Sequence, residues 1–280
     1  MTPTAGLGFK PIHFEAAMAC PAEGLWFEVH AENYMVGGGP RLAMLQSLRA
    51  SFPLSLHGVG LSLAGAAEPD RAHLARLKRL VDRFDPFLVS EHLAWSRNGG
   101  TIFPDLLPFP RTSEALEVIA RNIAITQDAL GRSILIENPA LYLALDGHEW
   151  PEPLFLAELV KRTGCGLLID VNNVFVSANN LSFDPASYLD AIPRGSIGEI
   201  HLAGHAPDPA LGRSLLIDSH DAPVSEPVWG LYDWLLARCD GFRPPTLIER
   251  DDSIPEFHEL LAERNRAASL MAGTGNLAHA

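Results

Sequence analysis

Cysteine, long apolar runs and basic residues are all scarce in this chain of 280 residues. The three cysteines, Cys20, Cys165 and Cys239, are far apart and form no CxxC pair, which argues against a disulfide framework and a structural zinc site. No stretch of about 20 uninterrupted apolar residues is present, so we expect no membrane span. The N-terminal segment has no basic region followed by an apolar stretch, so we expect no secretory signal and a cytoplasmic location.

Basic residues are outnumbered by acidic ones, 21 to 34, and the formal net charge is −13. A nucleic acid is therefore not the expected partner, because phosphate binding requires a basic surface. The acidic excess has two readings, a solubilising surface and carboxylates buried around cations. Patterns of other site classes are missing: there is no Walker A loop, no GxSxG elbow and no dinucleotide-binding glycine pattern after the first expected strand.

Seven short apolar runs each end in a histidine or a carboxylate. A charged or metal-binding side chain is costly to bury alone, so its repetition at the ends of apolar runs indicates one shared site. The runs cover residues 25–33, 54–59, 88–95, 134–139, 167–173, 199–205 and 246–251.

Stretches with helical patterning separate these runs and predict an α/β fold. They are 71–84, 112–131, 151–164, 184–192, 225–239 and 254–271. With 6–10 as a first strand, eight strands alternate with helices, as in a (β/α)₈ TIM barrel. We expect a single domain over 1–280, with the barrel over about 6–271 and a flexible tail over 272–280.

A barrel places its active site at the carboxyl ends of the strands, where the histidines and carboxylates fall. A doubly wound sheet is the alternative, but it would not bring seven strand ends around one point. Three segments are expected to be loops on this face: 32–40, 97–112 and 205–227.

Histidines and carboxylates at the strand ends are the candidate metal ligands. Of the adjacent Glu91 and His92, only one should face the barrel axis, because side chains alternate along a strand, and we expect it to be His92. Asn173 remains open between metal ligation through its amide oxygen and a turn-capping role, and His205 between a metal ligand, an acid–base group and a loop histidine. The eight candidates are His57, His92, Glu137, Asp170, His201, Asp218, His220 and Glu249.

Eight candidates exceed the three or four protein ligands of a single ion, so we expect two or three metal ions that share carboxylates, with Glu137 as a candidate bridge. Imidazole and carboxylate without thiolate suit iron, manganese or zinc. The alternative is that half of these residues are hydrogen-bonded groups lining a substrate pocket. Five further histidines are expected at the surface: His13, His73, His148, His258 and His279.

The segments around these residues resemble the DUF692 family, also called UPF0276, the multinuclear non-haem iron-dependent oxidases. The resemblance runs from about Gly6 to about Leu261 and rests on LSLHGVGLSL, LVSEHLAWS, ILIENP, GLLIDVNNVFVSANN, EIHLAGH, LIDSHDAPV and LIERD. It implies a TIM barrel with two or three iron ions, mixed-valent Fe²⁺/Fe³⁺, and dioxygen as co-substrate. The expected substrate is a cysteine-containing precursor peptide made by the ribosome, converted for example to a thiooxazole or an oxazolone–thioamide. A separate partner protein is expected to deliver the peptide.

Carried over one motif at a time, the resemblance also implies the ligands. They are His57 of LSLHG, His92 of the EH pair, Glu137 of IENP, Asp170 and Asn173 of DVNN, His201 of EIHLAGH, Asp218 and His220 of DSH, and Glu249 of the last strand. Asn179 and Arg250 depart from the family pattern, at positions expected to influence the peptide pocket. The DVNN and ENYM forms are most similar to the subgroup linked to bufferins and copper homeostasis.

Three other functions fit the strand-end pattern less well. A metal-dependent sugar isomerase typically has a lysine near its metals, and none is evident at these strand ends. An AP-endonuclease-like barrel would bind nucleic acid, which the net charge of −13 disfavours. A non-catalytic metal-binding protein is disfavoured because histidine and carboxylate sites under loops usually keep open coordination positions.

Overall fold

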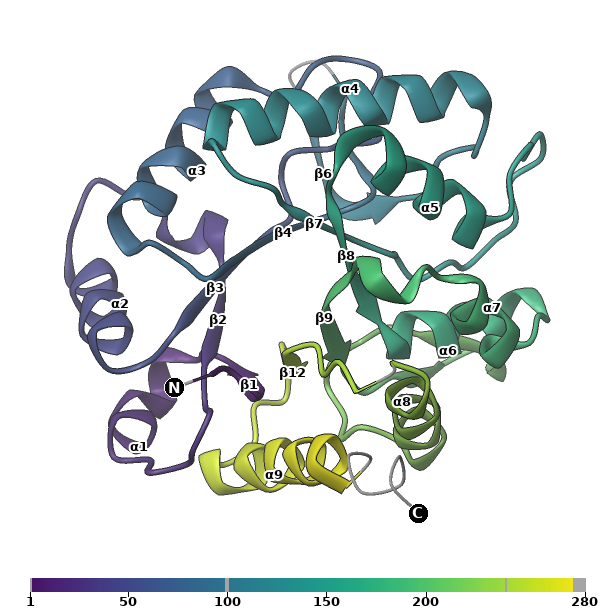
Figure 1. Cartoon of the computed structure of the whole chain (residues 1–280). Coiled ribbons are helices and arrows are strands. Elements are labelled where there is room, and N and C mark those ends of the chain that lie inside the picture. Colours follow the sequence, from purple (N-terminus) through teal and green to yellow (C-terminus); the bar gives the residue numbers. More distant parts are fainter. Residues whose placement is uncertain (1, 99–100, 240, 274–280) are drawn as a thin grey trace.

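Eight parallel strands close into a barrel in the computed structural model, which describes residues 2–98, 101–239 and 241–273 (Figure 1). The strands follow one another around the barrel in chain order, and the last pairs with the first. They are β1 (Ala5–Gly8), β2 (Phe27–His30), β3 (Leu54–Gly58), β4 (Leu88–His92), β7 (Leu135–Glu137), β8 (Gly166–Asp170), β9 (Ile197–Leu202) and β12 (Thr246–Ile248). The predicted single-domain TIM barrel is confirmed.

Helices surround the barrel, and each predicted helical stretch contains one of them. The α-helices are α1 (Phe14–Met18), α2 (Pro40–Ser51), α3 (Arg71–Phe84), α4 (Ser113–Leu130), α5 (Glu152–Thr163), α6 (Val171–Leu181), α7 (Pro185–Ala191), α8 (Glu226–Ala237) and α9 (Phe257–Gly273). Short 3-10 helices are η1 (Pro11–His13), η2 (Ala31–Tyr34) and η3 (Arg194–Ser196). Helix α9 extends two residues past the predicted end of the barrel, and 274–280 of the predicted tail lie outside the described residues.

Local sequence explains where these helices begin and which face they bury. In α4 the side chain of Thr112 accepts a hydrogen bond from the backbone N–H of Ala115 at 3.1 Å, and Gly131 ends the helix with a φ of 71°. In α3, leucines at helical spacing are buried against the barrel, whereas the arginines between them face outward.

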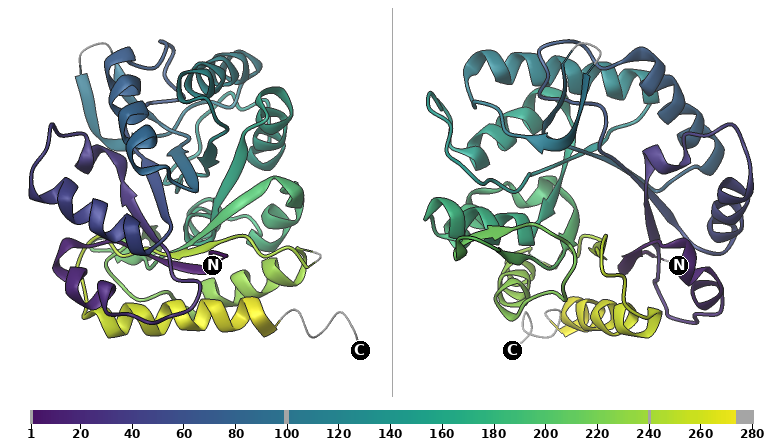
Figure 2. Two further views of the ribbon diagram at one scale, coloured as in Figure 1. Left: turned by 60° about the vertical axis from the view of Figure 1, so that its left-hand side comes forward. Right: turned by 180° about the vertical axis from the view of Figure 1, so that it is seen from behind.

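Two segments predicted as loops instead contain antiparallel hairpins. Strands β5 (Trp95–Asn98) and β6 (Thr101–Leu107) follow β4, and strands β10 (Ala206–Asp208) and β11 (Gly212–Ile217) follow β9. Figure 2 shows both hairpins outside the barrel wall. Their described residues are mostly exposed or half-buried, so the strong apolar runs that mark barrel strands are missing from them. Helix α6, which follows β8 directly, was also not predicted.

The pairing register brings the ends of neighbouring strands to one level. Partner positions are His30 and His57, His92 and Glu137, and Asp170 and His201. Because all barrel strands are parallel, these side chains lie at the same end of the barrel. The fold therefore assembles the predicted strand-end residues into one region.

Two of the histidines predicted at the surface are buried, so that prediction was wrong for them. His13 is 9% exposed and packs edge-on against the ring of Phe257, and His73 is 4% exposed with its Nε2 3.2 Å from Oε1 of Glu32. Both are on helices, as expected, but on the faces turned inward. His148 is half-buried, His258 is exposed and His279 lies outside the described residues.

No disulfide bond joins the cysteines among the described residues, and Cys165 and Cys239 are buried, which agrees with the expected core role of Cys165. Within the described residues, no helix combines the length and the apolar character needed to cross a membrane.

Candidate metal centre

His57, His92 and Glu137 converge at the ends of three neighbouring strands. Oε2 of Glu137 lies 3.1 Å from Nε2 of His57 and 3.2 Å from Nε2 of His92. Two atoms bound to one ion at about 2.1 Å lie about 3.0–3.4 Å apart when the angle between them is 90–110°. The three side chains are therefore spaced as ligands of one metal ion.

The other ring nitrogens of these histidines are anchored by the barrel. Nδ1 of His57 lies 2.7 Å from Oγ of Ser90, and Nδ1 of His92 lies 3.0 Å from the carbonyl oxygen of Gly58. A carbonyl only accepts, so Nδ1 of His92 donates and Nε2 of the neutral ring presents a lone pair to Glu137. Burial lowers the pKa of His92, which favours this neutral ring. A lone pair facing a carboxylate at 3.2 Å is repelled by it, and a proton or a metal ion between the two atoms removes this repulsion.

Without a metal ion, only a bound proton balances the negative charge of Glu137 in this group. Burial raises the pKa of Glu137, but His92 and His57 outweigh burial and lower it to about 2. Burial lowers the pKa of His57, but Glu137 outweighs burial and raises it to about 10. A metal ion in this position would displace the proton of His57.

A second group gathers around His220, on the loop that follows β11. Its Nε2 lies 2.8 Å from Oδ1 of Asp218, and its Nδ1 lies 3.2 Å from Oδ2 of Asp251. Asp170, His220 and Glu249 each present a ligand atom within 4.8 Å of the other two. The backbone of His220 has a φ of 49°, a strained value for a residue with a side chain, and such strain is concentrated at functional sites.

A glycine at the end of β9 allows this loop to lie close to the barrel. The carbonyl oxygen of Gly204 accepts a hydrogen bond from the backbone N–H of His220 at 3.1 Å. A Cβ atom at Gly204 would overlap the carbonyl group of Ala222. Any other residue at this position would push His220 and Asp218 away from the strand ends.

His201 lies fully buried between two layers of carboxylates. Its Nδ1 is 3.2 Å from Oε2 of Glu249, and its Nε2 is 3.3 Å from Oε1 of Glu28 and 3.6 Å from Oε1 of Glu199. Within the described residues, neither ring nitrogen makes a hydrogen bond of acceptable geometry. Ligands without hydrogen bonds in a buried position fit a metal centre better than a protein-only network.

The carboxylates of the centre repel one another. Burial, then Asp218 and Glu137, raise the pKa of Asp170 well above its ordinary value. Burial, then Glu28, raise the pKa of Glu199 to about 8. Within the described residues, buried oxygens without a hydrogen-bond partner include Oδ2 of Asp170 and both oxygens of Glu199. Cations would relieve this repulsion, so the donor set fits a multinuclear metal centre of imidazole and carboxylate.

The three residues left open by the sequence occupy different places. Asn173 lies in the centre: its Nδ2 is 3.4 Å from Oε1 of Glu137, and its buried Oδ1 makes no hydrogen bond to the described residues. Glu91 belongs to none of the possible metal groups among the described residues, and its Oε1 accepts the backbone N–H of Leu61 at 3.4 Å. Nδ1 of His205 lies 2.7 Å from Oδ1 of Asn172, at the edge of the centre.

Sequence reasoning missed Glu28, Glu199 and His30. Glu28 and Glu199 lie two residues before His30 and His201 on the same strands, so all four side chains face the barrel interior. The alternation of side chains along a strand was a usable signal for both glutamates. Nε2 of His30 is 3.4 Å from Oε1 of Glu249.

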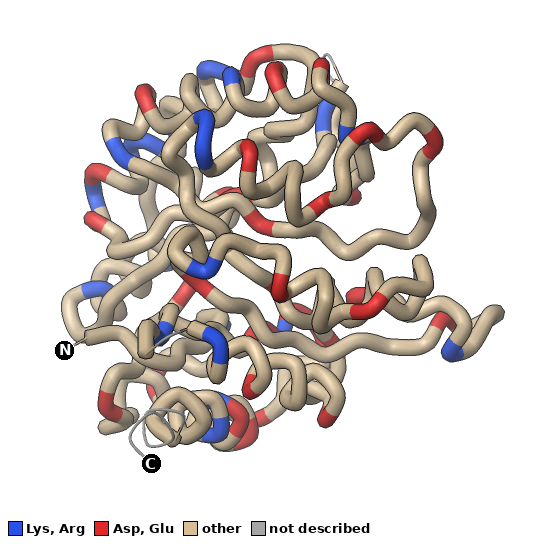
Figure 3. Tube along the Cα trace, turned by 45° about the vertical axis from the view of Figure 1, so that its right-hand side comes forward, with Lys and Arg blue, Asp and Glu red and all other residues tan. Residues whose placement is uncertain are grey.

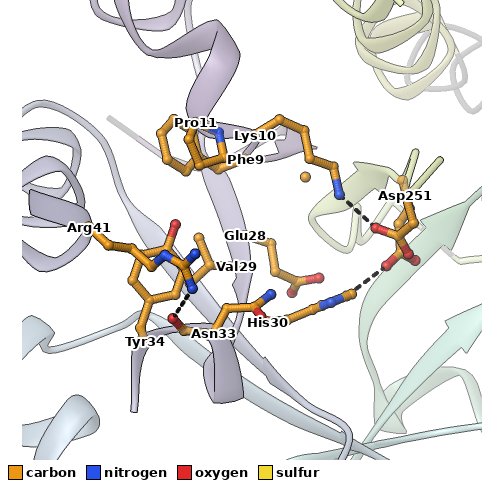
Figure 4. Close-up of a pocket in the computed structure, with 12 residues that line it drawn as sticks. Phe9, Lys10, Pro11, Glu28, Val29, His30, Asn33, Tyr34, Arg41 and Asp251 are labelled. Carbon is orange, nitrogen blue, oxygen red and sulfur yellow. Dashed lines mark hydrogen bonds and ion pairs between the residues drawn. The ribbon is translucent and has the colours of Figure 1, made fainter. Parts of the chain in front are cut away.

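Lys10 corrects the expectation that no lysine lies near the candidate metals. It follows β1, and its Nζ is 2.7 Å from Oδ1 of Asp251. Figure 4 shows this side chain reaching toward Asp251 across a cavity of about 190 Å³, which is also lined by Glu28, His30 and Glu249. The cavity is an opening beside the metal centre.

The two departures from the family pattern lie away from the centre. Arg250 is buried, and its Nη2 is 3.1 Å from Oε2 of Glu263 in α9. Asn179 is exposed on α6, and its Nδ2 donates to the carbonyl oxygen of Arg213 at 3.3 Å.

Comparison with solved structures supports the fold. A xylose isomerase-like TIM barrel protein from Mycobacterium smegmatis, in complex with magnesium, is similar with a TM-score of 0.62 and 11% identity, covering 98% of both chains. Endonuclease IV from Thermus thermophilus is similar with a TM-score of 0.58 and 18% identity, covering 97% of this chain and 99% of that chain. At such identities the likeness concerns the barrel alone.

Sequence comparison is far more specific. A UPF0276 protein of Caulobacter vibrioides strain NA1000 is 65% identical over 272 residues, 97% of this chain and 96% of its own length. A UPF0276 protein of Bordetella bronchiseptica is 51% identical over 269 residues, 96% of this chain and 92% of its own length. The family model described as RiPP precursor modification enzyme MbnB/TglH/ChrH matches residues 4–272. The chain therefore belongs to the DUF692, or UPF0276, family of enzymes that modify precursors of ribosomally synthesised peptides.

Proposed function

We propose that this chain is a multinuclear non-haem iron oxidase that uses dioxygen to modify cysteine residues of a ribosomally made precursor peptide. The observation that carries the metal part is the convergence of His57 and His92 on Glu137, whose Oε2 lies 3.1 and 3.2 Å from their Nε2 atoms. Membership of the precursor-modifying family supports the peptide part.

The proposed ligands divide into neighbouring groups. His57, His92 and Glu137 would hold one ion, and Asp170, His220 and Glu249 another. The remaining proposed ligands lie between or beside these groups: Asn173, His201 and Asp218. Iron, when bound, would supply electrons for the reduction of dioxygen and a Lewis acid for a cysteine thiolate.

The chain's own contribution is to orient the ligands and to restrict water. Ser90 and the carbonyl of Gly58 fix the rings of His57 and His92, so that both Nε2 atoms point at Glu137. The buried position of these groups keeps competing water from a reactive centre. A separate peptide-delivering partner and a role in bufferin synthesis and copper homeostasis complete the proposal.

Lys10 is a specific observation in favour of a sugar isomerase as the alternative. Its ammonium group lies beside the candidate metal centre, but Asp251 binds it at 2.7 Å. The oxidase is preferred because the sequence relatives belong to the peptide-modifying family over nearly the whole chain.

The test combines iron counting with mass spectrometry. The protein is reconstituted anaerobically with ferrous iron and incubated with a cysteine-bearing peptide encoded beside its gene, with and without dioxygen. We expect at least two iron ions per chain and, only with dioxygen, the loss of a few hydrogens per modified cysteine. Glu137→Gln should reduce turnover by about 100-fold or more, because it removes a charge between two histidines. Glu117→Gln, on the exposed face of α4, is the matched control and should leave turnover unchanged.

A stoichiometry below one iron per chain, with full activity on zinc, would contradict the oxidase. Peptide modification that proceeds equally without dioxygen would also contradict it.

A further inference from the structure

Helix α3 carries a concentration of positive charge on an acidic protein. Five of the 21 lysine and arginine residues lie within Arg71–Phe84, beside a single carboxylate, Asp82. Several blue positions lie at the upper left of Figure 3, with red positions among them, on the side on which α3 lies in Figure 1. Arg76, Arg79 and Arg83 are spaced three and four residues apart, so they share one face of the helix.

These three arginines line a cavity of about 530 Å³ between α3 and the segment that follows η2. The opposite wall includes Met35 and Val36, and Val36 is 49% exposed. The cavity thus combines cationic and apolar walls, the composition expected where a peptide is held by charge and by side-chain packing.

The charges of this cavity are only partly balanced, because its three arginines are lined up beside one carboxylate, that of Asp82. Asp82 is paired with Lys78, and among the described residues no carboxylate lies within ion-pair distance of Arg76, Arg79 or Arg83. The excess of positive charge favours an anionic ligand.

A second cavity adjoins this surface. It has a volume of about 540 Å³, and Met35 and Arg76 line both cavities. Its lining also includes Val59 and Gly60, which follow directly after β3, the strand that carries His57, and the carboxylates of Glu32 and Asp105. A chain that lies along α3 can therefore pass Arg76 toward the end of β3.

We propose that the groove formed by Arg76, Arg79, Arg83, Met35 and Val36 binds an acidic, extended segment of the peptide substrate. Arginines four residues apart on a helix have Cβ atoms about 5–6 Å apart, and alternate residues of an extended chain lie about 6–7 Å apart. Aspartates or glutamates at alternate positions match this spacing, and guanidinium groups bind carboxylates through two hydrogen bonds. The assignment deepens the proposed function and rests on it for the identity of the substrate.

Binding is tested with the iron-loaded full chain under anaerobic conditions. The probe is a fluorescein-labelled peptide with glutamate at alternate positions, compared by anisotropy with its glutamine counterpart. We expect Arg79→Glu/Arg83→Glu to weaken glutamate-peptide binding at least tenfold, and the glutamine peptide to bind at least tenfold more weakly than the glutamate peptide. Lys161→Glu/Arg162→Glu on α5 makes the same charge change and should alter binding less than twofold. Raising the salt from about 50 to about 300 mM should weaken binding as well.

Circular dichroism establishes whether each variant is folded. If Arg79→Glu/Arg83→Glu is not folded, the neutral variant Arg79→Gln/Arg83→Gln is used in its place. The proposed binding groove would be refuted if the protein bound the glutamate and glutamine peptides with equal affinity, or if wild type and variant bound the glutamate peptide with equal affinity. If a single-stranded oligonucleotide outcompetes the glutamate peptide, the groove binds nucleic acid and the proposed acidic peptide is refuted as its ligand.

Failure of the proposed groove can be distinguished from failure of the proposed oxidase activity. Because the probe has no cysteine and dioxygen is excluded, binding that depends on the two arginines supports the groove even if no peptide is ever modified. Conversely, if wild type and Arg79→Glu/Arg83→Glu oxidise a precursor at the same rate and with the same KM, the proposed groove is refuted and the proposed oxidase activity is supported.

Discussion

At the scale of single residues, Glu152 is a buried carboxyl group outside the metal centre. It lies at the start of α5, 9% exposed, with its Oε2 3.6 Å from Nη1 of Arg111. Burial raises its pKa to about 7, and neither Arg111 nor a hydrogen bond with Tyr188 is enough to offset this. Unlike the glutamates of the centre, it has no neighbouring candidate ligand whose metal would compensate.

Glu152 should make the protein less stable as the pH rises. Between about pH 4.5 and pH 7 the unfolded chain loses this proton while the folded chain retains it, so the free energy of unfolding falls through this window. Glu152→Gln removes the effect. Urea unfolding of the metal-free protein should show the glutamine variant gaining about 1–3 kcal/mol relative to wild type between pH 5 and pH 8. A difference that is the same at both pH values would refute the prediction, and Glu117→Gln is the control.

At the scale of elements, α6 joins helix formation to the metal centre. Asp170 ends β8 and is also the N-cap of α6, because its Oδ1 accepts the backbone N–H of Asn173 at 2.6 Å. Its other oxygen is buried without a hydrogen-bond partner among the described residues. One carboxylate therefore caps the helix and presents a candidate ligand atom to the centre.

Asparagine and alanine at position 170 should separate these two roles. Asparagine caps helices as well as aspartate does. In the metal-free state the free energy of unfolding of Asp170→Asn should therefore lie within about 1 kcal/mol of the wild-type value, or above it, because the substitution removes a buried charge that its neighbours repel. Asp170→Ala loses the cap and should be about 1 kcal/mol less stable than Asp170→Asn. Both should bind less iron than wild type, as measured by metal analysis after reconstitution. Iron content equal to wild type in Asp170→Asn would exclude Asp170 as a ligand.

At the scale of the whole molecule, the candidate ligands tie distant parts of the barrel together. His57, His92, Glu137, Asp170 and His201 lie on five strands, and Glu249 follows a sixth. A metal that binds only the folded arrangement stabilises the closed barrel through mass action.

Removal of metal should therefore lower the thermal stability of the entire barrel. At free iron about 100 times its dissociation constant, one site adds about 2.7 kcal/mol. For a chain of this size, that should raise Tm by roughly 4–6 °C. Calorimetry of iron-loaded and chelator-treated protein under anaerobic conditions measures the shift, and Glu137→Gln should reduce it. An unchanged Tm at saturating iron would show that the centre does not contribute to the fold.

The barrel was predictable because its signals are local. Each barrel strand is a short apolar run, buried on both faces, and the predicted helices carry apolar stripes, with capping side chains at the start of α3, α4 and α7. The hairpins after β4 and β9 were missed because their strands lack such runs. Buried histidines such as His73 were misplaced because helical spacing alone did not reveal that His73 faces Glu32, which lies on another element.

What the sequence alone determined is the barrel, the family and the set of strand-end histidines and carboxylates, since each is written in contiguous residues. Only the tertiary structure decided which side chains meet. Lys10 and Asp251 are 241 positions apart in the chain, yet barrel closure brings β1 beside β12 and places them in contact. The deeper layer formed by Glu28 and Glu199, and the continuity of the arginine groove with the strand ends, likewise depend on register and closure. These are properties of strand pairing in space, which no local pattern encodes.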